Sequence, residues 1–320
     1  MQTLGFGLIG CGDISQKRVA PALRDLDNCE LIAVTRAKAE LAEESAREFG
    51  ARRWYKTVPE LLEDAEVEAV YIATPHNQHA EQAIASAEAG KHVLCEKPLA
   101  LNAPDGRRII DACTKNGVKL GVAYYRHHYP VIGRVKEIVK SGEIGKVTMV
   151  QINAFESHQF PPGHPKYWTA VKEFAGGGPM MNFGCHRIEV IVDILGPVTA
   201  VASQLTNPLY QRDVEDNAAA LLRFEDGAIG VLSISKAVRE PADTLDVYGS
   251  KGSVHVPVLN KGALRVWTAD GERNEDHPPH RNFHQPLIDD FARAVVEDRE
   301  PDVNGEVALR VQEILDQVYG

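Results

Sequence analysis

The chain has 320 residues, more than one typical hydrophobic core accommodates, and this length predicts two domains. Hydrophobic residues make up 44% and charged residues 25%, which is typical of a folded globular protein. The net charge of -10, with no long basic run, argues against nucleic acid or an anionic membrane as the main partner. A local positive patch that binds a phosphorylated ligand remains compatible with this charge.

The cysteines are odd in number, widely spaced and without a Cys-x-x-Cys pair: Cys11, Cys29, Cys95, Cys113 and Cys185. Most of them lie within apolar runs, which predicts reduced, buried thiols in a cytoplasmic protein. The N-terminus enters an apolar, glycine-rich run without a basic start or a cleavage site. We therefore expect neither a signal peptide nor a transmembrane segment.

The first strand is predicted at Leu4 to Ile9, and a helix to about Leu23 follows the turn Gly10-Cys11-Gly12-Asp13-Ile14-Ser15. This G-x-G-x-x-S pattern is a small-residue variant of the dinucleotide fingerprint. Gly10 permits the tight turn, Gly12 lets the backbone approach a pyrophosphate at the helix N-terminus, and Ser15 keeps the helix close to the sheet. The alternative is a glycine-rich turn without a ligand.

The second strand is predicted at Cys29 to Val34. A fold that prefers NAD usually places an acid at this strand end, on the ribose 2′-hydroxyl. Here the strand ends in Thr35-Arg36, and the next acid is Glu40. Because guanidinium pairs well with phosphate, the sequence favours NADP(H) over NAD(H). The alternative is that Arg36 stacks on the adenine or faces solvent.

Residues 69 to 98 predict a strand, a helix and a parallel strand. The first strand is Ala69 to Ala73, the helix is capped by Asn77 and ended by Gly90, and the second strand is His92 to Cys95. Glu96-Lys97-Pro98 then lies at the carboxyl edge of the sheet, where ligands bind in open α/β folds. Lys97 is a candidate proton-transfer group, and the alternative is an ordinary surface lysine.

Further strands and helices alternate through the first part of the chain, with Thr57 and Asn102 as helix caps and a last strand at Lys119 to Ala123. This alternation predicts a parallel, doubly wound sheet in a first domain of residues 1–122. Apolar-polar alternation begins at Thr148, and later strands include a hairpin turn at Glu225-Asp226-Gly227. Residues 123–320 are therefore predicted to form a second domain on a large, mostly antiparallel sheet.

Candidate ligand-binding residues also occur in this second part. Tyr124 to His128 leaves the predicted sheet edge, and the long loop 158–174 contains Trp168 and Lys172. A glycine run, 176–178, precedes a predicted helix on which Asn182, His186 and Glu189 share one face. Such a run before a histidine suggests a close approach to a ligand, and the alternative is a half-buried histidine satisfied by its Asn or Glu neighbour.

Two histidine pairs have a loose metal-ligand spacing, His76-x-x-His79 and His277-x-x-His280. Neither is accompanied by the further ligands that a zinc site requires, so we predict no metal site. Gly-x-Ser-x-Gly and Walker motifs are also absent from the sequence.

Seven motifs follow one another along the chain: Gly10-x-Gly12, Thr74-Pro75, Ala89-Gly90-Lys91-His92, Glu96-Lys97-Pro98, Tyr125-Arg126, Ser141-Gly142-Glu143-Ile144-Gly145, and Gly176-Gly177-Gly178 before His186. In this order they resemble the glucose-fructose oxidoreductase / inositol dehydrogenase / MocA family. The resemblance implies an α/β fold: an N-terminal Rossmann domain and a C-terminal α+β domain on an open sheet. It also implies NAD(P)-linked redox chemistry on a sugar, cyclitol or related polyol or ketone, and a homodimer or homotetramer built through the C-terminal sheet.

The resemblance also implies site residues. The catalytic residues are expected to be Lys97, His186 and Asn182, where Asn182 stands in place of the family aspartate and Glu189 is a possible source of the missing charge. Cofactor binding is assigned to Gly10, Gly12, Asp13, Ile14, Thr35, Arg36, Thr74, Pro75, His76, Asn77, His79, Glu96, Lys97 and Arg126. Substrate binding is assigned to Lys97, Tyr125, Trp168, Lys172, Asn182 and His186.

Two other functions stay open at this point. One is a family member that uses NAD catalytically, for glycoside cleavage or epimerisation through a transient ketone. The other is a cofactor-binding regulator without catalysis, which Asn182 favours and the presence of Lys97 and His186 opposes.

Overall fold

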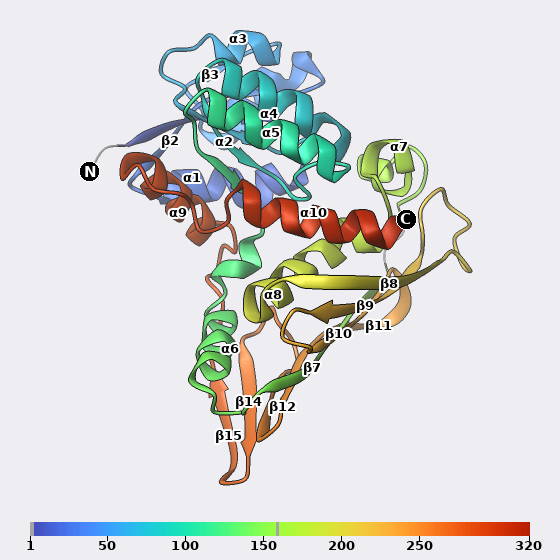
Figure 1. Ribbon diagram of the computed structural model, residues 1–320. Coiled ribbons are helices and arrows are strands. Elements are labelled where there is room, and N and C mark those ends of the chain that lie inside the picture. The colour runs from blue at the N-terminus through green and yellow to red at the C-terminus, as the bar shows by residue number, and fades with distance from the viewer. Residues whose placement is uncertain (1–2, 158–159) are drawn as a thin grey trace. The chain divides into compact units, whose positions relative to one another are not determined.

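The computed structural model describes residues 3–157 and 160–320, so residues 158–159 of the predicted long loop lie outside the described residues. The chain divides into two compact units (Figure 1). Unit 1 comprises Met1–Tyr125 and Arg281–Gln312, and unit 2 comprises Arg126–His280 and Glu313–Gly320. The sequence predicted one boundary after residue 122 and placed all of 123–320 in the second domain. The structure instead groups residues 281–312 with the first unit.

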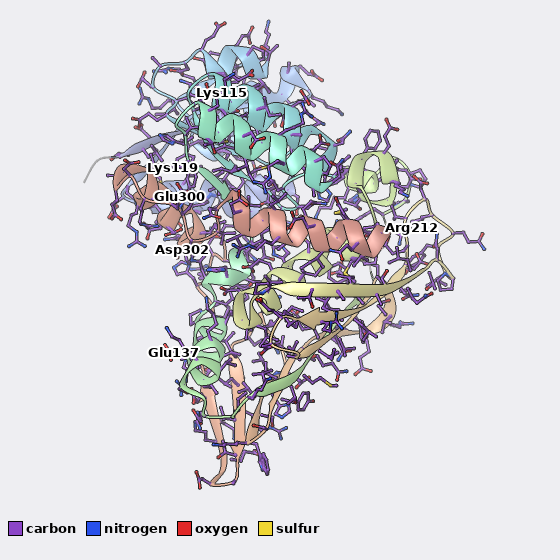
Figure 2. All side chains as sticks on the ribbon, in the orientation of Figure 1. Lys115, Lys119, Glu137, Arg212, Glu300 and Asp302 are labelled. Atoms are coloured by element: carbon purple, nitrogen blue, oxygen red, sulfur yellow. The ribbon has the colours of Figure 1, made fainter. Side chains whose placement is uncertain are left out.

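Backbone and side-chain contacts explain this grouping. Val122 N–H donates to Val303 O at 2.9 Å, and Gly121 pairs with Asn304 as an isolated antiparallel bridge. Lys119, just before the last strand of unit 1, lies 3.3 Å from Glu300 (Figure 2). The returning segment therefore extends the edge of the first sheet.

Unit 1 is built on a six-stranded parallel sheet in the order β3-β2-β1-β4-β5-β6, which confirms the predicted doubly wound fold. Its strands are β1 (Leu4–Ile9), β2 (Cys29–Thr35), β3 (Arg53–Trp54), β4 (Ala69–Ile72), β5 (His92–Cys95) and β6 (Leu120–Val122). The strand order reverses between β1 and β4. Ligands of such sheets bind in the crevice outside the carboxyl ends of strands at this point.

The helices of unit 1 cover both faces of this sheet. They are α1 (Ala20–Asp25), α2 (Ala42–Phe49), α3 (Val58–Leu62), α4 (His79–Glu88), α5 (Ala103–Lys115), α9 (Gln285–Val296) and the part of α10 (Gly305–Tyr319) up to residue 312. Helices α4 and α5 pack side by side, and α1 packs with α9 (Figure 1). Phe291 of α9 contacts the Phe6 ring of β1, which buries both residues in the core.

Two of the three predicted helix caps are confirmed. Thr57 forms a capping box with Glu60 at the start of α3, and Asn102 accepts the Asp105 N–H at 2.9 Å at the start of α5. The prediction for Asn77 is wrong. A 3-10 turn, η3 (His76–Gln78), precedes α4, whose N-terminus has no side-chain cap.

The helix after the glycine turn also differs from the prediction. A π-helix, η1 (Ser15–Val19), precedes α1. Pro21 has no N–H to donate, so the α-helical bond to Lys17 is missing, and the Ala20 N–H bonds back to Ser15 O. The predicted helix is therefore two segments with different hydrogen-bonding periods.

Unit 2 is built on a nine-stranded sheet in the order β15-β14-β13-β12-β7-β10-β9-β8, with β11 also paired to β7. All pairs are antiparallel except β7 with β10, which confirms the predicted mostly antiparallel sheet. The strands are β7 (Val147–Ser157), β8 (Val198–Thr206), β9 (Asn217–Phe224), β10 (Ile229–Ser235), β11 (Ala237–Asp243), β12 (Leu245–Gly249), β13 (Gly252–Val256), β14 (Ala263–Thr268) and β15 (Gly271–Asp276). The predicted hairpin turn at 225–227 joins β9 to β10, and Gly227 supplies the positive φ of +92°.

Helices α6 (Pro130–Ser141) and α8 (Cys185–Leu195) pack against one another in unit 2. Ile191 of α8 lies over Gly230 of β10, so α8 covers one face of the sheet. Shorter helical segments are η4 (Tyr125–His128), η5 (Tyr167–Ala170), α7 (Lys172–Ala175) and η6 (Met180–Gly184). Among the described residues, no helix has both the length and the apolar character needed to cross a membrane.

Candidate active site

The glycine turn after β1 is shaped by its neighbours. Gly10 has φ +97°, and a Cβ at this residue would lie 2.7 Å from Ala73 O, so only glycine fits. The Ser15 hydroxyl donates to Gly10 O at 2.6 Å, which holds the start of η1 against the turn. Nothing lies within 4 Å of a Cβ at Gly12, which is exposed. The backbone at Gly12 is therefore open to a ligand.

The carboxyl end of β2 presents a cation rather than an acid. Thr35 is buried, and its carbonyl accepts the Gly10 N–H at 2.9 Å. Arg36 is half-buried and donates to the Ser45 hydroxyl on α2 at 2.9 Å. Burial raises the pKa of the adjacent Cys11 thiol to about 11, against the opposing effects of Ser45 and Arg36. This corner of unit 1 thus combines a positive guanidinium with a neutral thiol.

The loops after β4 and β5 are joined by a histidine. His79 is buried, with Nδ1 2.8 Å from Pro98 O and Nε2 3.0 Å from Thr74 O. Burial lowers the pKa of His79, although both carbonyl contacts oppose that shift. The His79 ring therefore spans the two loops, and the single N–H of its neutral form donates to one of the two carbonyl oxygens.

One polar atom at this edge has no protein partner. Asn77 Oδ1 is buried without a hydrogen bond in the part of the chain that the structure describes. A buried amide oxygen of this kind is costly unless a ligand or water pairs with it. Because Asn77 does not cap α4, its side chain remains available for a ligand.

Glu96 lies at the end of β5 in a buried network. Its Oε1 accepts from the Tyr71 hydroxyl at 2.9 Å and lies 3.3 Å from His284 Nε2, and its Oε2 accepts the Lys97 N–H at 3.2 Å. Burial alone would raise the pKa of Glu96, but His284, Lys97 and Tyr71 together lower it below its usual value. Glu96 is thus an ionised anchor for the backbone of Lys97. The Lys97-Pro98 peptide bond is cis.

Sequence reasoning missed Tyr71 and His284 as members of this network. Tyr71 is fully buried within β4, and His284 lies 188 residues beyond Glu96 in the returning segment. The His284 ring also packs against Tyr125 with a centroid distance of 4.6 Å, and Tyr125 stacks on Phe283. The predicted substrate residue Tyr125 is therefore fixed by the same histidine as Glu96.

The glycine run before His186 has a structural explanation in unit 2. A Cβ at Gly177 would lie 2.2 Å from the Tyr319 hydroxyl oxygen, and a Cβ at Gly178 would lie 2.3 Å from Glu215 O. Glu215 accepts the backbone N–H groups of Gly178 and Met180 at 2.7 and 3.1 Å. Internal packing therefore requires glycine at residues 177 and 178.

Asn182 lies in the π-helix η6 and His186 in the first turn of α8, where it is buried. Glu189 Oε1 is hydrogen-bonded to His127, since it lies 2.8 Å from His127 Nδ1. This carboxylate oxygen is therefore directed to His127 and not to His186. His127, Glu189 and Asp193 bring three ligand-type atoms within 4.8 Å of one another. Lys136 Nζ, 2.8 Å from both Asp193 oxygens, already provides a cation beside this cluster.

The remaining predicted residues of unit 2 differ in exposure. Arg126 is buried, with Nη2 3.4 Å from Asn260 Oδ1 and 3.8 Å from Asp243 Oδ2. Trp168, in η5, is half-buried. Lys172 is exposed at the start of α7 and is placed by its backbone N–H, which donates to Asp213 at 2.8 Å.

The residues at the carboxyl edge of unit 1 fit a nicotinamide dinucleotide. The open Gly12 backbone at a helix start suits a pyrophosphate. The unpartnered Asn77 Oδ1 suits a donor such as a ribose hydroxyl or a carboxamide N–H. The buried, ionised Glu96 fixes the loop that carries Lys97.

Comparisons with known proteins agree with this geometry. Residues 4–124 match the family described as "Oxidoreductase family, NAD-binding Rossmann fold", and residues 132–255 match the GFO/IDH/MocA C-terminal domain. The chain is 30% identical to myo-inositol 2-dehydrogenase of Thermotoga maritima over 313 residues, which cover 94% of this chain and 91% of that protein.

Solved structures that share the fold at more than 25% identity include two whose bound cofactors are known. Levoglucosan dehydrogenase in complex with NADH and levoglucosan has a TM-score of 0.91 and 26% identity, covering 99% of this chain and 96% of that chain. KijD10, a 3-ketoreductase from Actinomadura kijaniata in complex with NADP, has a TM-score of 0.89 and 26% identity, covering 99% of this chain and 97% of that chain. Relatives of this chain thus bind either nicotinamide cofactor.

Proposed function

Because the chain belongs to the glucose-fructose oxidoreductase / inositol dehydrogenase / MocA family and is an NAD(P)-dependent oxidoreductase, we propose that it transfers a hydride between the nicotinamide and a sugar, cyclitol or related polyol or ketone. The observation that carries this proposal is the Glu96-Lys97 pair at the carboxyl end of β5, beside the strand-order reversal of a Rossmann sheet. The names of the relatives support a polyol or sugar as the substrate class.

Lys97 is assigned as the principal proton carrier for the substrate hydroxyl. Its backbone N–H is held by Glu96, which is itself fixed by Tyr71 and His284. His186 is assigned to the same hydroxyl as a second proton carrier. Asn182 can orient an imidazole but cannot stabilise an imidazolium by charge, so Lys97 carries most of the proton transfer. When bound, the nicotinamide accepts or supplies the hydride.

The cofactor-binding roles follow from the surroundings of each residue in unit 1. Gly10, Gly12, Asp13 and Ile14 are assigned to the pyrophosphate turn, and Thr74 to Asn77 to the nicotinamide side. His79 is assigned an indirect role, because its ring nitrogens face Thr74 O and Pro98 O. Glu96 likewise acts by positioning Lys97.

NADP(H) is the proposed preferred cofactor. Arg36 follows directly after β2 and is oriented by Ser45, and the first acid after the strand is Glu40, which is exposed. A guanidinium in this place favours a 2′-phosphate through charge-assisted hydrogen bonds, whereas a preference for NAD usually rests on an acid.

A homo-oligomer through the unit 2 sheet is also proposed. Met149, Leu221 and Trp267 are 41%, 52% and 52% exposed. The strand registers place all three side chains on one face of the sheet. Met149 pairs with Tyr248 and with Ile229, and the register continues from these two residues across the neighbouring strands to the strands of Trp267 and Leu221. Exposed apolar side chains gathered on one sheet face favour association with a second copy.

A reducing compartment such as the cytoplasm is proposed on the basis of the thiols. All five cysteines are free in the structure, and four of them are buried. Burial raises the pKa of Cys29 and of Cys113 to about 12, so these thiols are unreactive and contribute to packing.

The proposal for Lys97 is tested by Lys97→Met, which removes the amine and keeps an unbranched side chain. We expect kcat on a polyol and ketose panel to fall about 10²–10⁴-fold, the usual contribution of a positioned acid or base, while NADPH binding stays within about threefold. The control is Lys115→Met, on an exposed residue of α5 (Figure 2). Full turnover in Lys97→Met would exclude Lys97 from proton transfer.

A further inference from the structure

The helical run formed by η6 and α8, which carries two residues assigned to the substrate, begins without a local side-chain cap. Its first helical hydrogen bond runs from the Asn182 N–H to Gly178 O at 2.9 Å. The N–H groups of Gly178, Met180 and Met181 lie ahead of this bond and are buried. Pro179, between them, has no N–H. The three buried N–H groups therefore need acceptors from outside the helix.

Two side chains from distant parts of the chain, both in unit 2, accept all three N–H groups. Glu215 Oε2 accepts the Gly178 N–H at 2.7 Å, and Glu215 Oε1 accepts the Met180 N–H at 3.1 Å. The Tyr319 hydroxyl accepts the Met181 N–H at 3.0 Å and donates to Glu215 Oε1 at 2.7 Å. We call Glu215 and Tyr319 the remote cap. Because it satisfies every N–H group ahead of the first helical bond, the remote cap fixes where this helix begins.

Each member of the remote cap is held by its own surroundings. Glu215 is 8% exposed and lies two residues before β9. Tyr319 is the last residue of α10, and the carbonyl of the preceding Val318 accepts the hydroxyl of Ser203, on β8, at 2.8 Å. Strands β8 and β9 pair with one another, so both members are tied to one part of the sheet. The remote cap is therefore preorganised.

Stability alone does not account for a carboxylate in this place. Burial raises the pKa of Glu215, although the Tyr319 hydroxyl and the backbone N–H groups that it accepts lower it. Because the folded-state pKa lies above the unfolded-state value, ionisation of Glu215 lowers the free energy of unfolding as the pH rises through this range. Carboxyl groups perturbed in this way cluster at functional sites.

The helix connects the remote cap to the residues assigned to the substrate. Asn182 directly follows Met181, and His186 lies four residues further along the chain. The turn between them is π-helical, with the Cys185 N–H bonded back to Met180 O. Because the helical hydrogen bonds run onward from the capped residues, a shift at the remote cap displaces Asn182 and His186 together.

From this arrangement we propose that the remote cap positions Asn182 and His186 for hydride transfer, so that Glu215 and Tyr319 are positioning residues of the reaction. The inference rests on the proposed function and deepens it by naming two residues that act through the substrate-site helix. Catalysis is sensitive to such positioning, because a displacement of about 1 Å can slow a reaction about 10²-fold.

The test is Tyr319→Phe, which removes the acceptor of the Met181 N–H and keeps the aromatic ring. We expect kcat on the best substrate of the polyol and ketose panel to fall about 10–100-fold. The Kd for NADPH should stay within about threefold, because cofactor binding is assigned to unit 1. Glu215→Gln, which replaces one acceptor oxygen with an amide donor, should act in the same direction. Full wild-type kcat in Tyr319→Phe would overturn the inference and leave the proposed function standing.

Two control variants separate positioning from a general loss of stability. Tyr55→Phe removes a tyrosine–carboxylate hydrogen bond of 3.0 Å in unit 1, and Ile191→Val removes one buried methylene from α8. Both should keep kcat within about threefold of the wild type. An equal loss of kcat in Ile191→Val would overturn the inference, because it would trace the effect to the stability of the helix.

Amide hydrogen exchange, followed by mass spectrometry, gives a readout that does not need turnover. Peptides that span residues 176–186 should exchange at least about tenfold faster in Tyr319→Phe than in the wild type, and peptides of unit 1 should not change. A fall in kcat without faster exchange would overturn the inference. If the wild type transfers no hydride, faster exchange would keep the positioning assignment while refuting the proposed function, and unchanged exchange would refute both.

Discussion

The network around Glu96 supplies the most detailed prediction. The perturbation is Glu96→Gln, which keeps the shape of the side chain and removes its charge. In the native protein the carboxylate accepts from Tyr71 at 2.9 Å and from the Lys97 N–H at 3.2 Å, and it lies 3.3 Å from His284 Nε2. A glutamine has one acceptor oxygen and turns two N–H groups toward donors. At least one buried donor therefore loses its partner.

The expected loss of stability follows from these contacts. A hydrogen bond to a charged group contributes about 1.5–3 kcal/mol, and an unsatisfied buried donor costs about 1–3 kcal/mol. Since Glu96 is almost fully buried, solvent does not screen the loss. We expect Glu96→Gln to lower the free energy of unfolding by about 2–4 kcal/mol at pH 7, measured by urea titration. The control Glu88→Gln, at an exposed residue of α4, should change it by less than about 0.5 kcal/mol.

The pH dependence of this stability difference tests whether Glu96 is ionised in the folded protein. The folded-state pKa of Glu96 is lowered below 4.5, so its contribution is complete above the unfolded-state pKa and is lost as the pH falls through the folded value. The difference between wild type and Glu96→Gln should therefore be constant from pH 7 to about pH 5.5 and decrease toward pH 3. A difference near zero at pH 7, or one that grows on acidification, would show that Glu96 is not an ionised anchor.

Three further outcomes are expected. Arg36→Leu should raise the Kd for NADPH about 10–100-fold and leave the Kd for NADH within about threefold, as followed by tryptophan fluorescence quenching. Gly178→Ala should destabilise the protein by about 1–3 kcal/mol in urea because its Cβ would meet Glu215 O, whereas Gly133→Ala, in open space on α6, should stabilise it by about 0.5–1 kcal/mol. Leu221→Glu should reduce the particle mass measured by light scattering if the outer face of the unit 2 sheet joins two copies.

The strands of unit 1 could be predicted from the sequence because each is an apolar run bounded by turn residues. Strand β1 has the predicted bounds, and β4 and β5 agree to within one residue. Strands β11 and β15 of unit 2 were not predicted. The first contains Pro241 and charged residues, and the second reads Gly-Glu-Arg-Asn-Glu-Asp. Neither strand contains a buried residue, so neither shows the alternation of a half-buried strand.

Contacts between residues far apart in the chain limited how much of the site could be predicted from the sequence. The spacing of Gly10, Gly12 and Lys97 within local strand-helix units was sufficient to place them at one sheet edge. Nothing in the sequence links His284 to Glu96, because the contact depends on the return of residues 281–312 to unit 1. The contact between Gly177 and Tyr319 could not be predicted for the same reason, since Tyr319 lies more than a hundred residues away along the chain.

Hydride transfer can be followed with an isotope label on the cofactor. The protein is incubated with NADPH carrying deuterium at the transferable nicotinamide C4 position and with a panel of keto sugars and sugar acids, and the products are analysed by mass spectrometry. We expect one deuterium on the new carbinol carbon of a sugar product and about a 10²–10⁴-fold slower transfer in Lys97→Met. Tight binding of both cofactor and sugar without any transfer of deuterium would contradict it and identify a binding protein instead.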